Sequence, residues 1–195
     1  DDAVEAARAA QRDWAAMPPI ERAGYLVRLA DKVRSNAHEL ADILVQEQSK
    51  VRPLAEVEVN FTAEYLDYMA GWARRIEGEV LTSDRRDEHI FLFRKALGVV
   101  GGILPWNFPF FLIARKMAPA LVMGNTCVIK PSEETPLNCF AMTQLIDQLD
   151  LPRGVFNMVM GYGSTGAALA RHPDVDMVSF TGSVGTGAAI MAAAA

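Results

Sequence analysis

A turn rich in glycine and hydroxyl groups lies near the end of the chain. The segment Phe180-Thr181-Gly182-Ser183-Val184-Gly185-Thr186-Gly187 follows an apolar, strand-like run and leads into a helical pattern. Glycines let backbone amides approach an anion, and a helix N-terminus favours negative charge. No Lys follows the last Gly, so the spacing is neither a P-loop nor the Rossmann fingerprint. Gly182 and Ser183 are therefore candidate phosphate ligands, and a plain strand-to-helix turn is the alternative.

Lys130-Pro131-Ser132-Glu133 ends another strand-like segment. A carboxylate in this place can accept hydrogen bonds from both hydroxyls of an adenosine ribose, and a nearby ammonium can donate to the same sugar. The alternative is a solvated loop that carries two glutamates, Glu133 and Glu134.

Pro105-Trp106-Asn107-Phe108-Pro109 is the most unusual stretch, because two prolines bracket an aromatic residue and an amide at the predicted start of a helix. Asn107 could be the cap of that helix, which is a common role for Asn. It could instead donate its side-chain N–H to an oxyanion that forms during acyl-type chemistry. The residues of the turn leave both roles open.

Arg115 is a cation in the helix predicted over 108–122, which is apolar almost all round and should be buried. A buried cation is costly unless a group pairs with it. Arg115 follows Phe111 by four residues and Asn107 by eight, so it should lie on an adjoining part of the same surface. We expect Arg115, beside Phe111, to bind a polar substrate group; a structural ion pair is the alternative.

The remaining reactive side chains show no catalytic or metal-binding spacing. Cys127 falls inside a predicted strand and Cys139 on a predicted helix, so both are expected to be buried small apolar residues rather than nucleophiles. His38, His89 and His172 form no ligand pair, and we expect no metal site.

The elements that must position these residues change character along the chain. Residues 1–77 have helical periodicity. Within them Pro53 is predicted to be a first-turn residue of a long helix, whose buried face is predicted to be Leu54, Val57, Phe61, Tyr65, Tyr68 and Trp72.

From residue 78 onwards, strands alternate with helices. This βαβα order predicts an α/β fold, a parallel sheet with helices on both faces, whose ligands bind beyond the carboxyl ends of the strands. The predicted strands are 89–95, 96–104, 126–130, 155–160 and 175–181, and the predicted helices are 108–122, 136–149, 165–171 and 187–195.

Composition narrows the classes of function. The 195 residues carry a net charge of −5, which does not favour nucleic acid or an anionic membrane as a partner. No apolar run reaches the roughly 20 residues of a membrane span. Two cysteines make no disulfide framework, and no signal peptide is evident, so we expect a cytoplasmic protein. The last helix has no stop signal, so we expect the protein to continue.

Several motifs in a fixed order carry a family resemblance. The sequence PWNFP, then NTCVIKPSEETP, then LPRGVFNMVMG, then FTGS resembles the aldehyde dehydrogenase superfamily, over essentially the whole chain. The stretches EVEVNFTAEYLDYMAGWARRIEGE and PWNFPFFLIARKMAPAL are most similar to the branch of lactaldehyde and glycolaldehyde dehydrogenases.

The resemblance implies a domain organisation. Residues 1–77 would be the N-terminal helices of an NAD-binding domain, 78–96 part of an oligomerisation element, and 97–195 a Rossmann-like NAD-binding core. The catalytic domain, with the nucleophilic Cys and the general-base Glu, would lie outside this chain. The reaction would be thiolate attack on an aldehyde, hydride transfer to NAD and hydrolysis of the thioester.

The resemblance also implies roles for residues. Asn107 matches the oxyanion donor, Lys130 and Glu133 match contacts to the adenosine ribose, and Gly161 and Ser183 match positions near adenine and pyrophosphate. The expected cofactor-binding residues are Leu104, Trp106, Lys130, Ser132, Glu133, Gly161, Thr165, Gly182 and Ser183.

We therefore expect part of an NAD-dependent enzyme that oxidises small aldehydes, with or without a hydroxyl group, to carboxylic acids. NAD should be preferred to NADP, because Glu133 would repel a 2′-phosphate. We expect a homo-oligomer, a dimer or tetramer, without nucleic acid or membrane partners. The alternatives are a relative that acylates CoA or reduces acyl phosphates, and a non-catalytic nucleotide-binding module.

Overall fold

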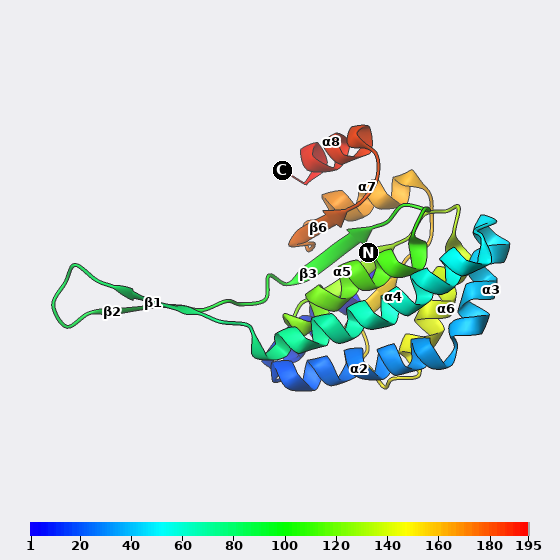
Figure 1. Ribbon diagram of the computed structural model, residues 1–195. Coiled ribbons are helices and arrows are strands. Elements are labelled where there is room, and N and C mark those ends of the chain that lie inside the picture. The colour runs from blue at the N-terminus through cyan, green and yellow to red at the C-terminus, as the bar shows by residue number, and fades with distance from the viewer. Residues whose placement is uncertain (195) are drawn as a thin grey trace.

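The computed structural model describes residues 1–194, and in it a helical segment precedes a parallel sheet (Figure 1). A proline lies in the first turn of two helices in this segment, where its missing N–H would have no partner within the helix. The helices are α1 (Asp2–Ala16), α2 (Pro19–Ser35), α3 (Ala37–Gln48) and α4 (Arg52–Ala70), followed by the 3-10 turn η1 (Gly71–Arg74).

The predicted buried face of α4 is wrong. Five of its six large residues are exposed, and only Tyr65 is half-buried. The helix instead turns a different face inward, and most of the residues on that face are small, which lets it lie close against α2 and α5. The buried residues of α4 are Ala55, Glu58, Val59, Thr62, Ala63, Leu66 and Ala70.

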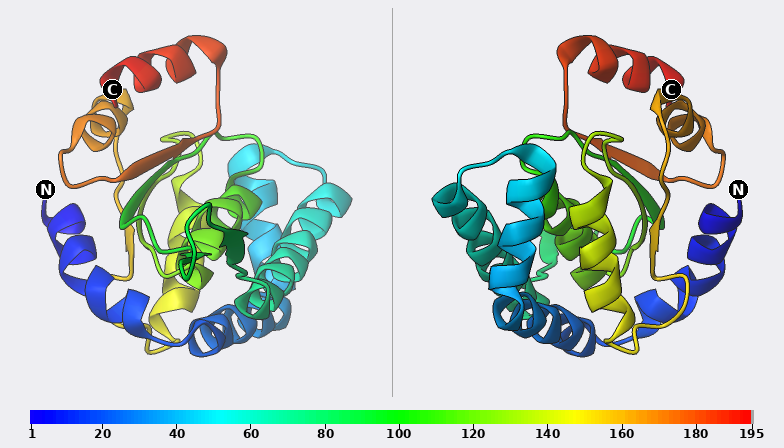
Figure 2. Two further views of the ribbon diagram at one scale, coloured as in Figure 1. Left: turned by 90° about the vertical axis from the view of Figure 1, so that its left-hand side faces the viewer. Right: turned by 90° about the vertical axis from the view of Figure 1, so that its right-hand side faces the viewer.

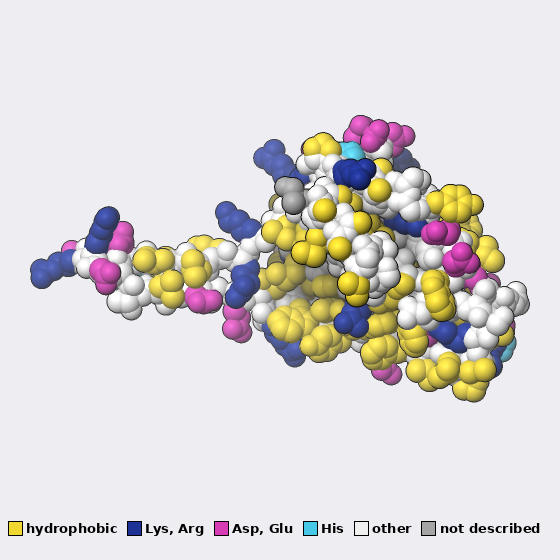
Figure 3. Space-filling view, turned by 90° about the horizontal axis from the view of Figure 1, so that it is seen from above, with side chains coloured by type: hydrophobic (Ala, Val, Ile, Leu, Met, Phe, Trp, Pro, Cys, Tyr) yellow, Lys and Arg dark blue, Asp and Glu magenta, His cyan; other side chains and the backbone are white. Residues whose placement is uncertain are grey.

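A two-stranded hairpin projects from the body (Figure 1). Its strands are β1 (Glu79–Thr82) and β2 (His89–Leu92), which pair antiparallel with Val80 opposite Phe91. The strand predicted over 89–95 therefore ends earlier, at Leu92. Every residue of both strands is exposed, and Figure 3 shows hydrophobic side chains along the hairpin and charged ones at its tip.

The parallel sheet confirms the predicted fold class. Its strands lie in the order β5-β4-β3-β6 and all pair in parallel. The chain moves outward from β3 to β4 and β5, then crosses back to place β6 on the other side of β3. The elements are β3 (Val99–Ile103), α5 (Pro109–Val122), β4 (Thr126–Lys130), α6 (Pro136–Asp147), β5 (Phe156–Met158), α7 (Gly163–Arg171), β6 (Met177–Phe180) and α8 (Val184–Ala193).

The strand predicted over 96–104 begins three residues late for a physical reason. The backbone N–H groups of Leu97 and Gly98 donate to the side-chain oxygen of Asn125, at 2.7 and 3.0 Å. These two amides are therefore bound to a side chain, and the ladder with β4 starts at Val99.

Helices cover the two faces of the sheet (Figure 2). On one face α1 and α7 form a small core with alternate residues of β3, Val99 and Ile103. On the other face α5 and α6 lie over the sheet with α2, α3 and α4 outside them, and this larger core includes Val100 of β3. No helix within the described residues is long and apolar enough to span a membrane.

Candidate functional site

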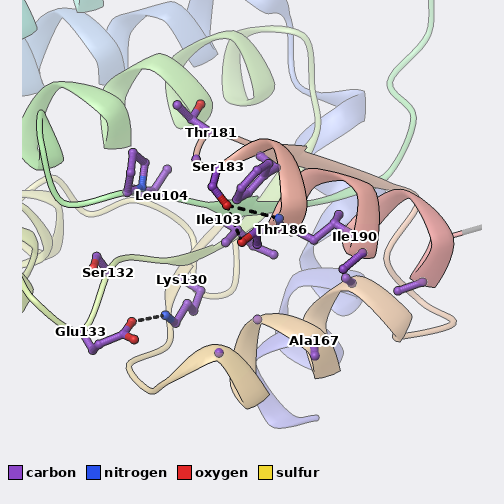
Figure 4. Close-up of a pocket in the computed structure, with 18 of the residues that line it drawn as sticks. Ile103, Leu104, Lys130, Ser132, Glu133, Ala167, Thr181, Ser183, Thr186 and Ile190 are labelled. Carbon is purple, nitrogen blue, oxygen red and sulfur yellow. Dashed lines mark hydrogen bonds and ion pairs between the residues drawn. The ribbon is translucent and has the colours of Figure 1, made fainter.

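A cavity of about 370 Å³ opens at the carboxyl ends of β3, β4 and β6 (Figure 4). Strand β3 is the point where the chain's path through the sheet reverses, and such switch points are where open α/β sheets bind ligands. The strands contribute Ile103, Lys130 and Phe180 to the wall. Helices α7 and α8 close the other side with Gly166, Ala167, Thr186 and Ile190.

Six of the nine predicted cofactor residues line this cavity together. They lie at or just after the ends of three different strands, β3, β4 and β6. The motifs that predicted them lie up to about 80 residues apart in the chain. The six are Leu104, Lys130, Ser132, Glu133, Gly182 and Ser183.

The other three predicted cofactor residues lie outside the cavity wall. Trp106 is exposed and lines a separate hollow with Gln48 and Thr135. Gly161 has a φ of 144°, and a Cβ built on it would lie 2.2 Å from the Thr165 hydroxyl oxygen. Gly161 and Thr165 thus pack together at the start of α7 and shape the turn that brings Gly163 to the cavity.

Lys130 and Glu133 form an ion pair at the mouth of the cavity. The Lys130 ammonium lies 3.0 Å from a Glu133 oxygen, and the Lys130 side chain is buried while that of Glu133 is 39% exposed. A hydrogen bond from its own backbone N–H, and then the Lys130 ammonium, lower the pKa of Glu133 below its ordinary value. The pair therefore presents an ionised carboxylate beside an ammonium donor.

The N-terminus of α8 faces the cavity from the opposite side. Ser183 is its N-cap: the hydroxyl accepts from the Thr186 backbone N–H at 3.2 Å and lies 2.9 Å from the Thr186 hydroxyl (Figure 4). Thr186 was missed from the sequence, although a hydroxyl residue three positions after an N-cap is a recognisable signal. Free amides and two hydroxyls here can donate to an anion.

The turn that carries Asn107 is built differently from the predicted helix cap. Helix α5 has Phe108, not Asn107, at its N-cap position, and no side chain of the turn caps it. The N–H groups of Phe110 and Phe111 instead donate to the carboxylate of Glu58 on α4, at 2.9 and 3.1 Å. Asn107 is exposed, and its side-chain amide makes no hydrogen bond within residues 1–194.

Arg115 does not have the buried position predicted for it. It is exposed although most of α5 is buried, and no carboxylate pairs with it in the part of the chain described. Its guanidinium carbon lies 6.0 Å from the ring centre of Phe111, which in turn contacts Phe61 and Tyr65. The ion-pair alternative is thus unsupported, and the guanidinium is available to a ligand.

Both cysteines are buried, as predicted. Neither Cys127 nor Cys139 has measurable exposure, and burial raises the pKa of each thiol well above its ordinary value. A thiol held neutral and inaccessible is a poor nucleophile. Across residues 1–194 no group of three His, Cys, Asp or Glu side chains could hold a metal ion.

Comparison with known proteins identifies the family of this chain. The sequence profile of the aldehyde dehydrogenase family matches residues 1–195. The chain belongs to the aldehyde dehydrogenase family. Lactaldehyde dehydrogenase of Escherichia coli is 59% identical over 194 residues, and the match covers 99% of this chain and 40% of that protein. Its crystal structure superimposes with a TM-score of 0.97 at 58% identity, over 98% of this chain and 40% of that one.

Two further similar structures are named for a nicotinamide dinucleotide. PnpE, solved in complex with nicotinamide adenine dinucleotide, is 41% identical to this chain with a TM-score of 0.95. The match covers 98% of this chain and 39% of that one. An E. coli NADP-dependent enzyme is 34% identical with a TM-score of 0.96, and the match covers 98% of this chain and 40% of that one. The chain thus spans about two fifths of the length of these relatives.

Proposed function

We propose that this chain is the dinucleotide-binding part of an enzyme that oxidises small aldehydes with NAD. The observation that carries the proposal is the cavity at the switch point of the sheet, which joins the Lys130–Glu133 pair to the N-terminus of α8. The identity to lactaldehyde dehydrogenase supports a small hydroxyaldehyde as the substrate.

The donor set of the cavity fits the adenosine diphosphate half of a dinucleotide. Glu133 would accept from the ribose hydroxyls while Lys130 donates to the same sugar. The amides and hydroxyls at Gly182 and Ser183 would bind phosphate oxygens. Ile103, Ala167 and Ile190 offer an apolar wall to adenine. When bound, the nicotinamide would supply the acceptor for the substrate hydride.

We assign Leu104 and Ser132 to the same cavity wall, and Gly161, Thr165 and Trp106 to supporting positions around it. Gly161 and Thr165 would shape the turn before α7, and Trp106 would border the cofactor from the hollow at the start of α5.

Asn107 would act on the substrate carbonyl. When a nucleophile attacks an aldehyde, the carbonyl oxygen becomes an oxyanion, and a fixed N–H donor stabilises that charge. The exposed, unbonded amide of Asn107 can take this role. Arg115 and Phe111 would bind the substituent of the substrate, Arg115 through a hydroxyl or carboxylate oxygen. The nucleophile and the general base would come from the rest of the enzyme.

The domain assignment follows the same logic. Residues 1–77 and 97–195 would form the dinucleotide-binding domain, and 78–96 an oligomerisation element. An isolated two-stranded hairpin is marginally stable in water, so the exposed apolar residues of β1 and β2 would be covered by another subunit. We infer a homo-oligomer located in the cytoplasm.

The test is a titration of NAD and NADP into the protein and into Glu133→Gln. Repulsion of a 2′-phosphate by Glu133 should favour NAD by roughly 10- to 100-fold in affinity. Glu133→Gln should lose this preference. Glu64→Gln, which changes an exposed carboxylate of α4 outside both the cavity and the hollow at Trp106, is the matched control and should keep it.

The pH dependence of this preference is a second readout. Because the pKa of Glu133 is lowered, the carboxylate stays ionised as the pH falls through the ordinary value of about 4.3. The preference for NAD should therefore persist at about pH 5, reduced only because the 2′-phosphate of NADP, with a second pKa of about 6, carries less negative charge there than at about pH 8. Equal affinity for both dinucleotides in the unchanged protein would contradict the role of Glu133.

A further inference from the structure

We propose that Lys50 and Glu58 are positioning residues, which hold the turn at 106–111 so that the Asn107 side chain points its amide at the substrate oxyanion. The inference rests on the function proposed above, and it concerns two residues to which the sequence analysis assigned no role. Its basis is a set of contacts that binds the backbone on both sides of Asn107 and leaves the side chain free.

Glu58 is a charged residue in the core of the molecule. It has no measurable exposure, and it projects from α4 toward the start of α5. One carboxylate oxygen accepts from the N–H groups of Phe110 and Phe111, and the other binds the Lys50 ammonium. Glu58 thus fixes the first turn of α5, directly after Asn107, from a different helix.

Lys50 fixes the other side of the same turn. Its side chain is only 10% exposed, and its ammonium donates to the carbonyl oxygen of Asn107 at 3.1 Å while it binds Glu58. The ammonium also lies 4.2 Å from the ring centre of Phe108. One cation therefore holds the Asn107 peptide, the next side chain and the buried carboxylate.

The connection between α3 and α4 directs these contacts. Ser49 adopts the left-handed conformation with a φ of 55°, and this turn sends Gln48 and Lys50 toward residues 106–108. The Gln48 side-chain amide donates to the carbonyl of Trp106. Two consecutive carbonyls, of Trp106 and Asn107, are thus bound by neighbouring residues of one loop.

Stability alone does not account for this arrangement. A local Asn or Ser at the N-cap would satisfy the amides of α5 at less cost, and a buried ion pair is often no more stabilising than an apolar pair of the same volume. Here the cap is supplied from a distance, and Asn107 is released from capping. Small displacements of a group that contacts the reacting atoms can lower the rate about 100-fold. A fixed backbone at Asn107 would therefore keep its side-chain amide in the position that catalysis needs.

A double-mutant cycle tests the inference in the complete enzyme. We would measure NADH formation from lactaldehyde in a single turnover, with enzyme in excess, for Lys50→Met, Asn107→Ala and the double variant. Lys50→Met should lower the rate roughly 10- to 100-fold. In the Asn107→Ala background it should change the rate by less than about twofold, because the side chain it positions is gone.

Further variants separate positioning from folding. Lys50→Arg keeps a donor cation and should recover most of the rate. The same cycle with Glu58→Gln, which keeps an acceptor for the α5 amides, applies if Lys50→Met does not fold. Arg52→Met is the control: it breaks ion pairs with Asp42 and Glu56 beside the same connection but makes no contact with the turn, so its rate should be unchanged.

The affinity for NAD and the melting temperature are measured for every variant. NAD affinity should stay the same, because neither Lys50 nor Glu58 lines the cavity. An equal fall in rate in both backgrounds would mean that the pair acts on stability alone and would overturn the inference. Failure of the proposed function would look different: the unchanged enzyme would form no NADH from lactaldehyde.

Discussion

At the scale of single residues, the turn at 105–109 holds Asn107 by its backbone and does not use its side chain as a helix cap. The backbone of Asn107 is held by Lys50, while its side chain caps nothing within residues 1–194. The cap belongs to Glu58. The structure therefore argues against the capping role of Asn107, and its role as an oxyanion donor stays a prediction.

Asn107→Ala should therefore affect chemistry and not folding. In the complete enzyme the rate of acylation should fall by roughly 10²–10³, the usual effect of removing one oxyanion donor. Cofactor affinity and melting temperature should change little, because the side chain is exposed and unbonded. Single-turnover kinetics and thermal melts check this. A lower melting temperature with normal turnover per folded molecule would instead assign Asn107 a structural role in the turn.

Arg115→Met addresses the substrate. Arg115 is exposed near Phe111 without a carboxylate partner in the described chain, so its loss should cost little stability. The value of kcat/KM should fall about tenfold or more for lactaldehyde, since a hydrogen bond to a charged donor is lost. For propanal, which lacks the hydroxyl, it should barely change. An equal fall for both aldehydes would contradict a contact with the hydroxyl group.

The two cysteines give a prediction for the chain by itself. Cys127 and Cys139 are buried with raised thiol pKa values, so iodoacetamide should modify neither at about pH 8 in the native state. Both should react after unfolding in urea, as mass spectrometry would record. The purified 195 residues should form no NADH from aldehydes. Rapid native labelling, or NADH formation, would show that one of the thiols can act.

At the scale of elements, glycines set how closely the helices approach the strands. Gly154, in the turn before β5, has a φ of 86°, and a Cβ built on it would lie 2.2 Å from the backbone oxygen of Ala6 in α1. Helix α1 can therefore pack on the sheet only because residue 154 has no side chain.

Gly154→Ala should destabilise the protein by about 2–4 kcal/mol, because it adds both a strained φ and a clash with backbone. Gly71→Ala is the matched control: Gly71 has a φ of −60°, and a methyl group added there would meet no atom within 4 Å. Its effect should lie within about 0.5 kcal/mol. Urea unfolding measures both, and similar midpoints for the two variants would show that α1 can shift without cost.

At the scale of the whole molecule, the β1–β2 hairpin projects away from the sheet and helices, and all residues of its two strands are exposed. Its exposed apolar residues include Phe91, which stacks on Phe93 with ring centres 6.5 Å apart. Hydrophobic surface on a projecting element marks a contact between proteins.

If the subunits of the proposed homo-oligomer meet through this hairpin, Phe91→Asp should give smaller species in sedimentation velocity, because a charge would be buried in the contact. Arg86→Asp, at the exposed tip between the strands, should leave the oligomer intact. If Phe91→Asp sediments like the unchanged protein, the subunits associate through another surface.

Much of the fold could be predicted from the sequence, because its signals are local. The strand Thr126–Lys130 has the predicted bounds, and the βαβα rhythm predicted the parallel sheet with helices on both faces. Motifs at the strand ends, together with the family resemblance that they carry, identified six residues that share one cavity. The strands and the sheet depend on periodicity and residue types within short segments, whereas the role of Leu104 was expected from the resemblance alone.

The tertiary structure alone decided which groups meet. The buried face of α4 was mispredicted because size and apolarity do not reveal which side of a helix its neighbours contact, and here α2 and α5 contact a face made mainly of small residues. Arg115 is likewise exposed because the other elements leave its part of α5 uncovered, and the apolar sequence of α5 does not indicate this. Lys50 and Glu58 contact the turn at Asn107 across about 50 positions of sequence, and no pattern within either segment indicates that contact.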